Sequence, residues 1–361
     1  MKILSVIPDL YTWGGIQKMA RVINDGLSGE FEVEAVNWEA KFPFSLKGFI
    51  KYFPDSLAGF VYNRFFGRYF ERTSDPSGSD LIHFWHPEAA LSASSILKRG
   101  FPYVVTCLGL EVLPGNLRGF RRQAYREILQ GARLVHAISR YTRDLVIEIL
   151  EVDPDKIRLI NPPIDYGLFV SDPTRTGSST VIGTLTRLQK RKNVPNIIRA
   201  LEILARDGDV DLTYHLAGDG PDRRDILNQL QKVSFKWKYF GAVSEEFKRS
   251  TFYPSLDLFV MPPLDLPNEI EGFGIVYVEA NALGVPVIAS RTGGVEEAVR
   301  AGVSGEFADP EHPEDIARVI REMLPRRNQY AGPARRWAQK FDVSIAAGRF
   351  EELYREAEAM K

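Results

Sequence analysis

Short apolar runs and helical patterns alternate along this chain, and this alternation constrains its fold more than any other feature. In the first half, runs typical of buried strands cover residues 2–7, 31–38, 81–85, 103–106 and 134–138. Helical patterns lie between these runs. Strand–helix alternation predicts parallel sheets joined by right-handed crossovers, so we expect an α/β fold.

A second series of the same kind follows a linker at residues 172–179, which contains turn-forming residues and little that could be buried. We therefore expect an N-terminal domain over 1–170, a C-terminal domain over 171–342, and a charged helix over 343–361 that returns to the N-terminal domain. In the second domain the pattern predicts strands at 181–185, 212–217, 256–261 and 285–290, and helices at 194–206 and 223–232.

Composition excludes several other classes of protein. The 361 residues include 46 basic and 47 acidic side chains, which argues against a nucleic-acid-binding protein that depends on a positive surface. The single cysteine, Cys107, cannot form an internal disulfide or supply a cysteine-based zinc site. No membrane-spanning segment is visible, and the N-terminal apolar run is too short for a signal peptide. We expect a cytoplasmic protein, or one bound peripherally to the inner face of the membrane.

Residues 269–288 form the stretch richest in chemistry. Gly272 and Gly274 open a short helix, where glycines let backbone N–H groups approach a ligand and the helix N-terminus favours an anion. Glu271 precedes this helix and Glu279 lies within it. The helix is otherwise apolar, hence buried, and a buried carboxylate needs a partner. We therefore interpret both glutamates as ligand-binding groups and not as solvated side chains.

Two cations follow the first strand of the second domain. Arg187 and Lys192 lie at the entry to a helix, where basic residues oppose the helix dipole unless an anion lies between them. Arginine suits bidentate phosphate contact, and lysine supplies a point charge. The alternative is a solvated basic turn, since Lys190 and Arg191 lengthen the run. The pattern favours a phosphate site.

These segments resemble the retaining nucleotide-sugar glycosyltransferases of family 4, which carry a Glu-x7-Glu signature matched by Glu271 and Glu279. The resemblance implies the GT-B fold, in which two Rossmann-like α/β domains face each other across a cleft. It covers the C-terminal half almost continuously and the N-terminal half in patches. Other matching segments are Gly14-Gly15, 161–165, 183–188, Lys192-Asn193 (where Gly is commoner than Asn), 216–221, 240–245, 284–287 and 293–297.

The resemblance also implies roles for individual residues. The C-terminal domain would bind a nucleotide diphosphate sugar, with Glu279 on the ribose hydroxyls and Glu271 on the donor sugar. Arg187 and Lys192 would stabilise the leaving diphosphate, so these two cations and Glu271 are the catalytic candidates. The remaining donor-binding candidates are Gly14, Gly15, Gly272, Phe273, Gly274 and Ile275.

The implied reaction moves a hexose-type sugar to a glycan or glycolipid acceptor, with retention at the anomeric carbon, in the assembly of a surface polysaccharide or glycolipid. No metal or other cofactor is expected, because Arg187 and Lys192 supply the positive charge. Two alternatives stay open: a non-catalytic nucleotide-sugar-binding protein, and a nucleotide-sugar epimerase of the same fold.

One position departs from the family pattern. Leu108 stands where many members carry a histidine that helps to position the donor sugar and the acceptor. His83, His86 and Glu111 are the acceptor-side candidates that could replace it. The alternative for both histidines is an ordinary hydrogen bond at a strand end.

Residues 41–72 combine aromatic and basic side chains. The segment holds eleven of the 41 aromatic residues and six basic residues against two acidic ones. This mixture suits an anionic lipid surface or a lipid-linked acceptor. The alternative is a helical segment whose aromatics pack on the N-terminal domain.

Overall fold

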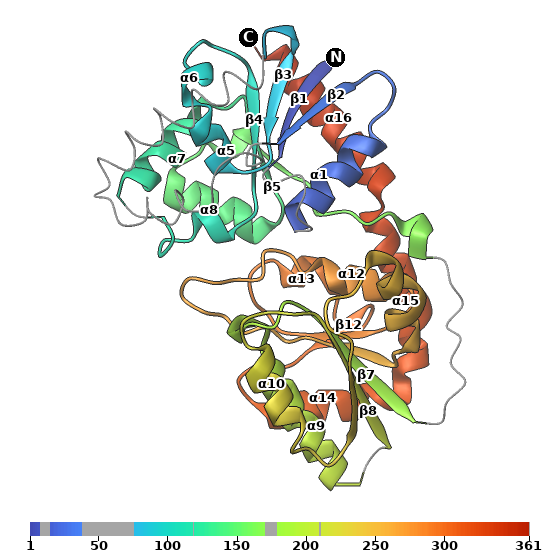
Figure 1. The fold of residues 1–361 in the computed structure, drawn as a ribbon. Coiled ribbons are helices and arrows are strands. Elements are labelled where there is room, and N and C mark those ends of the chain that lie inside the picture. Colours follow the sequence, from blue (N-terminus) through green and yellow to red (C-terminus); the bar gives the residue numbers. More distant parts are fainter. Residues whose placement is uncertain (8–14, 38–75, 118, 170–178, 209–210, 361) are drawn as a thin grey trace. The chain divides into compact units, whose positions relative to one another are not determined.

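The computed structural model describes residues 1–7, 15–37, 76–117, 119–169, 179–208 and 211–360 (Figure 1). The chain forms two compact units. Unit 1 comprises Met1–Pro163 and Val343–Lys361, and unit 2 comprises Ile164–Asp342.

The change from unit 1 to unit 2 falls before the boundary expected between residues 170 and 171. The reason is a pair of hydrogen bonds to the end of unit 2. The backbone N–H of Ile164 donates to the Phe341 carbonyl at 2.9 Å, and the N–H of Tyr166 donates to the Asp342 carboxylate at 3.1 Å. These bonds attach the segment before the linker to unit 2.

Unit 1 contains one six-stranded sheet in the order β2-β1-β3-β4-β5-β6, and all its strand pairs are parallel. Its central strands are buried along their length because helices cover both faces of a parallel sheet. The strands are β1 (Lys2–Ile7), β2 (Glu32–Asn37), β3 (Leu81–Phe84), β4 (Tyr103–Cys107), β5 (Leu134–Ala137) and β6 (Ile157–Leu159). The helices are α1 (Gly15–Gly26), α5 (Pro87–Ser92), α6 (Ser94–Leu97), α7 (Phe120–Gly131), α8 (Arg140–Leu150) and α16 (Val343–Ala359).

The last helix, α16, belongs to unit 1 and lies beside α1 (Figure 1). Its buried residues recur at helical spacing and therefore form one face. The ring of Phe350 on this face lies 5.4 Å from that of Trp85 and 4.8 Å from that of His136, measured between ring centres. Aromatic contacts of this kind attach the helix to the sheet.

A chain of hydrogen bonds crosses the sheet beneath α16. The imidazole of His136 donates through Nε2 to the Ile160 carbonyl (2.8 Å), so its Nδ1 accepts from the Thr106 hydroxyl (2.9 Å). Thr106 in turn accepts from Nε2 of His83 (2.8 Å), whose Nδ1 accepts from the Tyr354 hydroxyl (2.8 Å). All four side chains are buried. Burial lowers the pKa of both imidazoles, which keeps them neutral and gives the donor and acceptor roles described here.

Unit 2 contains a second parallel six-stranded sheet, in the order β12-β11-β10-β7-β8-β9. The strands are β7 (Thr180–Leu185), β8 (Leu212–Ala217), β9 (Lys236–Tyr239), β10 (Leu258–Val260), β11 (Val287–Ala289) and β12 (Gly305–Phe307). The helices are α9 (Val194–Arg206), α10 (Arg223–Leu230), α11 (Glu245–Phe247), α12 (Ile275–Ala282), α13 (Val295–Ala298), α14 (Pro313–Met323) and α15 (Arg327–Ala338).

The strand order of unit 2 is that of a Rossmann sheet. Chain order reverses between β7 and β10, and ligands of such sheets bind outside the carboxyl ends of the strands at this reversal. The sheet therefore directs attention to the segments that follow β7 and β10.

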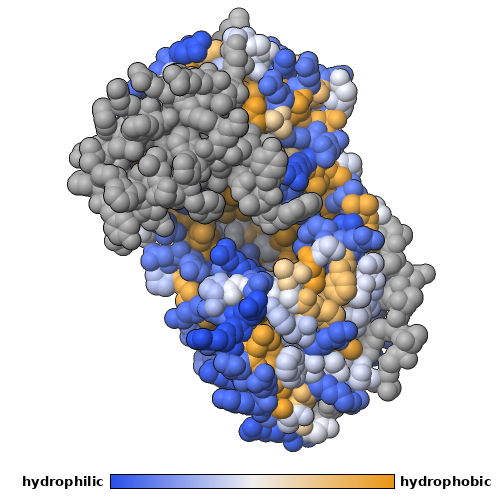
Figure 2. Space-filling model, viewed as in Figure 1, coloured by the Kyte–Doolittle hydropathy of each residue, from blue (hydrophilic) through white to orange (hydrophobic). Residues whose placement is uncertain are grey.

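Hydrophilic residues gather over α9 and α10, the outer layer of unit 2, on the face shown in Figure 2. Both helices bury an apolar side and expose charged residues such as Arg199 and Arg224. In the described part of the chain, no helix is both long enough and apolar enough to cross a membrane.

Candidate active site

The segment after β7 is a short basic turn at Lys190–Lys192, which leads into α9. Asn193 ends this turn in the left-handed conformation (φ 60°), which asparagine adopts more readily than most residues other than glycine. Its side-chain amide donates to the carbonyls of Pro262 (3.0 Å) and Pro310 (2.7 Å). Asparagine therefore meets the backbone need that glycine meets, and it adds two hydrogen bonds.

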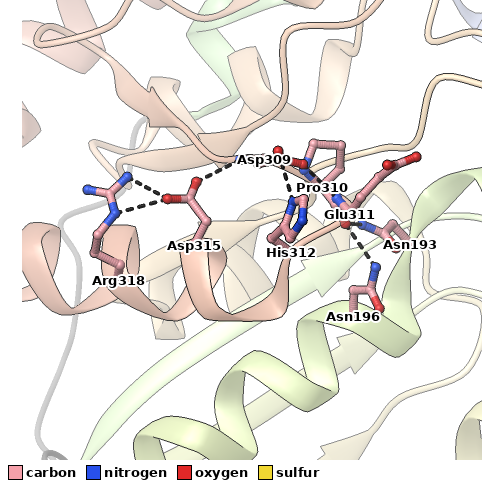
Figure 3. A network of polar contacts seen from close by, with 8 residues as sticks. All are labelled: Asn193, Asn196, Asp309, Pro310, Glu311, His312, Asp315 and Arg318. Carbon is pink, nitrogen blue, oxygen red and sulfur yellow. Dashed lines mark hydrogen bonds and ion pairs between the residues drawn. The ribbon is translucent and has the colours of Figure 1, made fainter.

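These bonds attach the basic turn to two other loops. Pro262 follows β10, and Pro310 lies in the loop between β12 and α14, where Asn196 also donates to its carbonyl at 2.9 Å (Figure 3). Asp309 and Asp315 brace that loop through the hydrogen bond between the Asp309 N–H and the Asp315 carboxylate (Figure 3). The turn is thus fixed at the carboxyl edge of the sheet.

Three charged side chains meet at this edge. Nη1 of Arg191 donates to Oε2 of Glu271 at 2.6 Å, and Nζ of Lys192 forms an ion pair with the same oxygen. All three side chains are only 11–13% exposed. The other oxygen, Oε1, accepts no hydrogen bond from any residue that the structure describes. The carboxylate is therefore held by one oxygen, and its second oxygen is available to a ligand.

Burial and charge act against each other in this cluster. Burial raises the pKa of Glu271, but the charges of Lys192 and Arg191 and their hydrogen bonds outweigh it, so the pKa lies below its ordinary value. Burial also lowers the pKa of Lys192. Glu271 offsets part of that effect, while Arg191 adds to it. Glu271 is thus an anion at neutral pH.

The loop that carries Glu271 is packed against a glycine turn. The backbone N–H of Gly294 donates to the Glu271 carbonyl at 2.9 Å. A Cβ atom at Gly293, whose φ is 53°, would lie 2.2 Å from the same carbonyl oxygen. Gly274 precedes α12 with φ 90°, another conformation that favours glycine. These glycines permit the close approach that places Glu271 before α12.

Glu279 lies inside unit 2 and is 1% exposed. Its Oε2 accepts a hydrogen bond from the Tyr253 hydroxyl at 2.9 Å. Burial, together with the Glu279 charge, raises the pKa of Tyr253 well above its ordinary value, so the tyrosine is a donor at all ordinary pH values. Tyr253 belongs to no sequence motif, so the sequence alone does not single it out.

Arg187 differs from the other cations. It is exposed, and it forms no ion pair with any described residue. The turn at residues 216–221 contains Gly218 and Gly220 and lies against the backbone around Arg187. A Cβ at Gly218 would lie 1.8 Å from the Thr186 carbonyl oxygen, and a Cβ at Gly220 would lie 2.3 Å from the Leu188 carbonyl oxygen. The turn at 216–221 therefore packs directly on the segment that carries Arg187.

The acceptor-side candidates lie in unit 1 but in different settings. His83 is fully buried in the hydrogen-bond chain described above, which makes it a core residue here and not a substrate contact. His86 caps α5, where its Nδ1 accepts from the N–H of Glu88 at 3.0 Å. Oε1 of Glu111 accepts from the N–H of Leu108 at 2.5 Å, so Glu111 fixes the backbone at the position that departs from the family pattern.

Other predictions concern residues without a described structure. Gly14 and the segment 41–72 lie outside the described residues, whereas Gly15 is the first residue of α1. Among the described His, Cys, Asp and Glu side chains, no group of three or more is placed to hold a metal ion.

Comparison with known proteins places the chain in a family. The family model described as "Glycosyltransferase Family 4" matches residues 13–167, and the one described as "Glycosyl transferases group 1" matches residues 171–339. Together they span most of the chain, which therefore belongs to these glycosyltransferases. The resemblance seen in the sequence is thereby confirmed at the level of the family.

Individual relatives are more distant. A GDP-mannose-dependent alpha-(1-6)-phosphatidylinositol monomannoside mannosyltransferase of Mycolicibacterium smegmatis is 32% identical over 238 residues, which span 60% of each chain. A D-inositol 3-phosphate glycosyltransferase of Catenulispora acidiphila is 27% identical over 312 residues, which span 78% of this chain and 73% of the relative.

Solved structures share the fold. Anabaena HepE in complex with UDP has a TM-score of 0.78 at 20% identity, covering 98% of this chain and 100% of that protein. Sucrose-phosphate synthase of Thermosynechococcus elongatus also reaches 0.78, at 18% identity over the full length of both chains. With the two parallel sheets, this likeness confirms two Rossmann-like domains of the GT-B type.

Proposed function

We propose that this protein is a retaining glycosyltransferase that moves a hexose-type sugar from a nucleotide diphosphate sugar to a glycan or lipid-linked acceptor. The observation that carries the proposal is the buried cluster of Arg191, Lys192 and Glu271 between the ends of β7 and β10. Rossmann sheets bind their ligands at this place. Burying charged side chains lowers the stability of the fold unless each charge is paired or binds a ligand.

The relatives support a donor of this class. The Mycolicibacterium smegmatis relative is named for GDP-mannose, and the Anabaena protein was solved with UDP and with UDP-glucose. Two relatives are named for phosphatidylinositol or inositol phosphate acceptors. These names favour a nucleotide diphosphate sugar as donor and are compatible with a lipid-linked acceptor.

The cluster can perform the chemistry of sugar transfer. As the bond between the anomeric carbon and the diphosphate breaks, negative charge grows on the leaving phosphate, and Lys192 and Arg187 stabilise it. In this proposal Oε1 of Glu271, which accepts no hydrogen bond from a described residue, accepts hydrogen bonds from donor-sugar hydroxyls. The backbone from Gly272 to Ile275 lines the sugar and diphosphate, and Glu279 binds the ribose. The acceptor hydroxyl loses its proton to the leaving phosphate, so no side-chain base is assigned.

The setting of the reaction completes the proposal. We place the enzyme in the cytoplasm, on the inner face of the membrane, with residues 41–72 attaching it to anionic lipid. The protein should co-sediment with vesicles containing anionic lipid at low salt and should be released from them as the salt concentration rises. Replacing Lys47, Lys51, Arg64 and Arg68 by Glu should abolish this binding. Wild-type protein that ignores such vesicles at low salt would refute the membrane role.

The activity can be tested with a panel of UDP, GDP and ADP and the matching sugars. A nucleotide at about 100 times its dissociation constant should stabilise the fold by roughly 2.7 kcal/mol, which thermal unfolding detects. The bound donor should then be consumed with EDTA present, since no metal is required, and the product should keep the donor's anomeric configuration by NMR. A strict need for Mg²⁺ or Mn²⁺, or an inverted product, would contradict the mechanism.

A second candidate rests on Leu108, since no imidazole stands at this position. A non-catalytic nucleotide-sugar-binding protein would bind the same nucleotides without releasing them from their sugars. Measuring free UDP or GDP after incubation with the sugar donor and candidate acceptors discriminates the two, because only the enzyme forms it.

A further inference from the structure

The buried cluster contains one cation, Arg191, to which the proposed function gives no task. Arg187 is exposed and unpaired among the described residues, and Lys192 is the buried lysine proposed to bind phosphate. Arg191 was interpreted from sequence only as lengthening a basic run. In the structure its guanidinium is 12% exposed and forms its hydrogen bond to Glu271.

Arg191 lies beside two carboxylates. Oε2 of Glu271 lies 2.6 Å from its Nη1, and Oε2 of Glu269 lies 3.8 Å from its Nε. The buried Nε donates no hydrogen bond to any described residue. Arg191 thus lies beside two carboxylates, whereas Lys192 pairs with Glu271 alone among the described residues.

The negative charge that grows on the leaving diphosphate acts differently on Lys192 and Arg191. When the donor's bond breaks, the diphosphate gains negative charge and attracts the mobile ammonium of Lys192 away from Glu271. A buried carboxylate left without a counter-charge would take up a proton. A protonated Glu271 would be a weaker acceptor of hydrogen bonds from the sugar hydroxyls.

We infer that Arg191 is a positioning residue that keeps Glu271 ionised and oriented while Lys192 turns to the leaving diphosphate, an inference that rests on the proposed function. The planar guanidinium suits this task because it is charged at all working pH values and fixes the carboxylate's geometry. The basic turn supplies both charges from adjacent positions, and the Asn193 clamp holds that turn at the sheet edge.

The groups that face Glu271 define the expected pH behaviour. They are Arg191 and Lys192 from the basic turn and Tyr277 from α12, with Glu269 beyond Arg191. Removing Arg191 leaves burial opposed by Lys192 alone, so the pKa of Glu271 rises. The acidic limb of the pH profile of turnover should therefore move upward, by about one pH unit or more for the loss of a contacting charge.

The test uses Arg191→Gln, Arg191→Lys and the control Lys190→Gln, assayed with UDP-glucose and GDP-mannose. Lys190 is exposed in the same turn, so its removal costs the same charge without touching Glu271. Arg191→Gln should shift the acidic limb upward, Arg191→Lys should restore much of it, and Lys190→Gln should match wild type. If Arg191→Gln lowers turnover but leaves the acidic limb of the pH profile where it is in wild type, the inference is overturned, because that result indicates a general structural defect.

A double-mutant cycle separates an effect through Glu271 from direct phosphate binding. In a Glu271→Gln background, Arg191→Gln should cost no further UDP or GDP affinity and no further turnover. An equal loss in both backgrounds would show that Arg191 binds phosphate itself. Should Arg191→Gln fail to fold, the double variant should regain the fold, because a neutral amide then replaces the buried carboxylate that Lys192 alone had to balance. A double variant that also fails to fold would count against the inference.

Failure of the proposed function looks different. If wild-type protein binds no nucleotide and consumes no donor, the glycosyltransferase proposal falls, and the Arg191 role falls with it. If wild type is active while the cycle shows no coupling between Arg191 and Glu271, only the Arg191 role is overturned.

Discussion

Each unit contains a buried polar cluster, and the two clusters differ in how completely they are satisfied. In unit 1, Tyr354, His83, Thr106 and His136 form a closed and neutral chain that ends on a backbone carbonyl. In unit 2, two cations share one carboxylate oxygen, and Oε1 of Glu271 has no partner among the described residues. A neutral chain whose hydrogen bonds are all made orients the core. A charged cluster with an unused hydrogen-bond acceptor is suited to binding a ligand.

The difference in unused hydrogen-bond capacity indicates which buried polar residues are suited to a function. His83 belongs to a strand-end motif, yet both of its ring nitrogens are used inside unit 1. Arg191 belongs to no motif that the sequence singled out, yet it contacts the proposed catalytic carboxylate. The hydrogen-bond capacity that remains after folding is the better guide.

The largest expected effect comes from removing a charge in unit 2. Lys192→Ala should lower turnover by about a hundred- to a thousand-fold, because it removes one electrostatic stabiliser of the leaving group. Steady-state kinetics measures this loss, with circular dichroism as the check of folding. A folded Lys192→Ala variant with near-normal turnover would show that the charged cluster of unit 2 has no more to do with catalysis than the neutral chain of unit 1.

Acid should weaken unit 1 through its neutral chain. Burial lowers the pKa of His136 to about 4 and that of His83 well below its ordinary value. The unfolded chain therefore binds more protons, and stability is full above about pH 6.5 and is lost as the pH falls toward 4, by about 1.4 kcal/mol per pH unit for each histidine.

Hydrogen exchange of peptides from β3 to β5, measured at pH 6.5 and pH 5.5 after correction for intrinsic rates, follows this loss locally. A His136→Asn variant should show a shallower pH dependence than wild type. Equal slopes in the two proteins would contradict the neutral assignment.

The nucleotide end of the site should respond to Glu279→Ala. The lost carboxylate is a charge-assisted acceptor, so nucleotide affinity should fall by roughly 1.5–3 kcal/mol. Calorimetry with UDP and GDP measures the change. Tyr253→Phe is the matched control, because it removes the partner hydroxyl of Glu279 and keeps the carboxylate. Unchanged affinity in folded Glu279→Ala would remove the ribose role.

A loss of stability, and not of binding, tests the clamp that Asn193 forms on the basic turn. Asn193→Gly keeps the left-handed conformation but loses the hydrogen bonds to Pro262 and Pro310, at about 0.5–1.5 kcal/mol each. Asn193→Ala should cost a further 1 kcal/mol or so, because alanine is strained at positive φ. Urea unfolding compares the two variants. Equal stability of Asn193→Gly and wild type would show that the clamp does not hold the turn.

The sequence predicts regular elements well where apolar periodicity is strong. The strand expected at 181–185 is β7 (Thr180–Leu185), and the helix expected at 194–206 coincides with α9. The strand expected at 256–261 is shorter in the structure, because a helical turn continues to Ser255 and β10 begins at Leu258. Strand β9 was missed because its sequence, Lys-Trp-Lys-Tyr, is largely exposed and has no apolar run.

The candidate site was predictable only in part. Glycine turns and the charged residues near β7 and β10 stand out locally, so Glu271 and Lys192 could be found. The Tyr253–Glu279 and Arg191–Glu271 pairs join residues far apart in the chain, and local patterns carry no signal for such contacts. Arg191 could have been ranked above Lys190 only by knowing which side of the turn faces the sheet.

The most direct test of the central claim is calorimetry of UDP-glucose and GDP-mannose, with UDP and GDP, against wild type and Lys192→Ala. We predict that wild type binds at least one of these nucleotides, that affinity falls in Lys192→Ala, and that Lys190→Gln binds like wild type. Folded wild-type protein that binds none of the four, or a Lys192→Ala variant that binds as tightly as wild type, would contradict the claim that this cluster is a nucleotide diphosphate site.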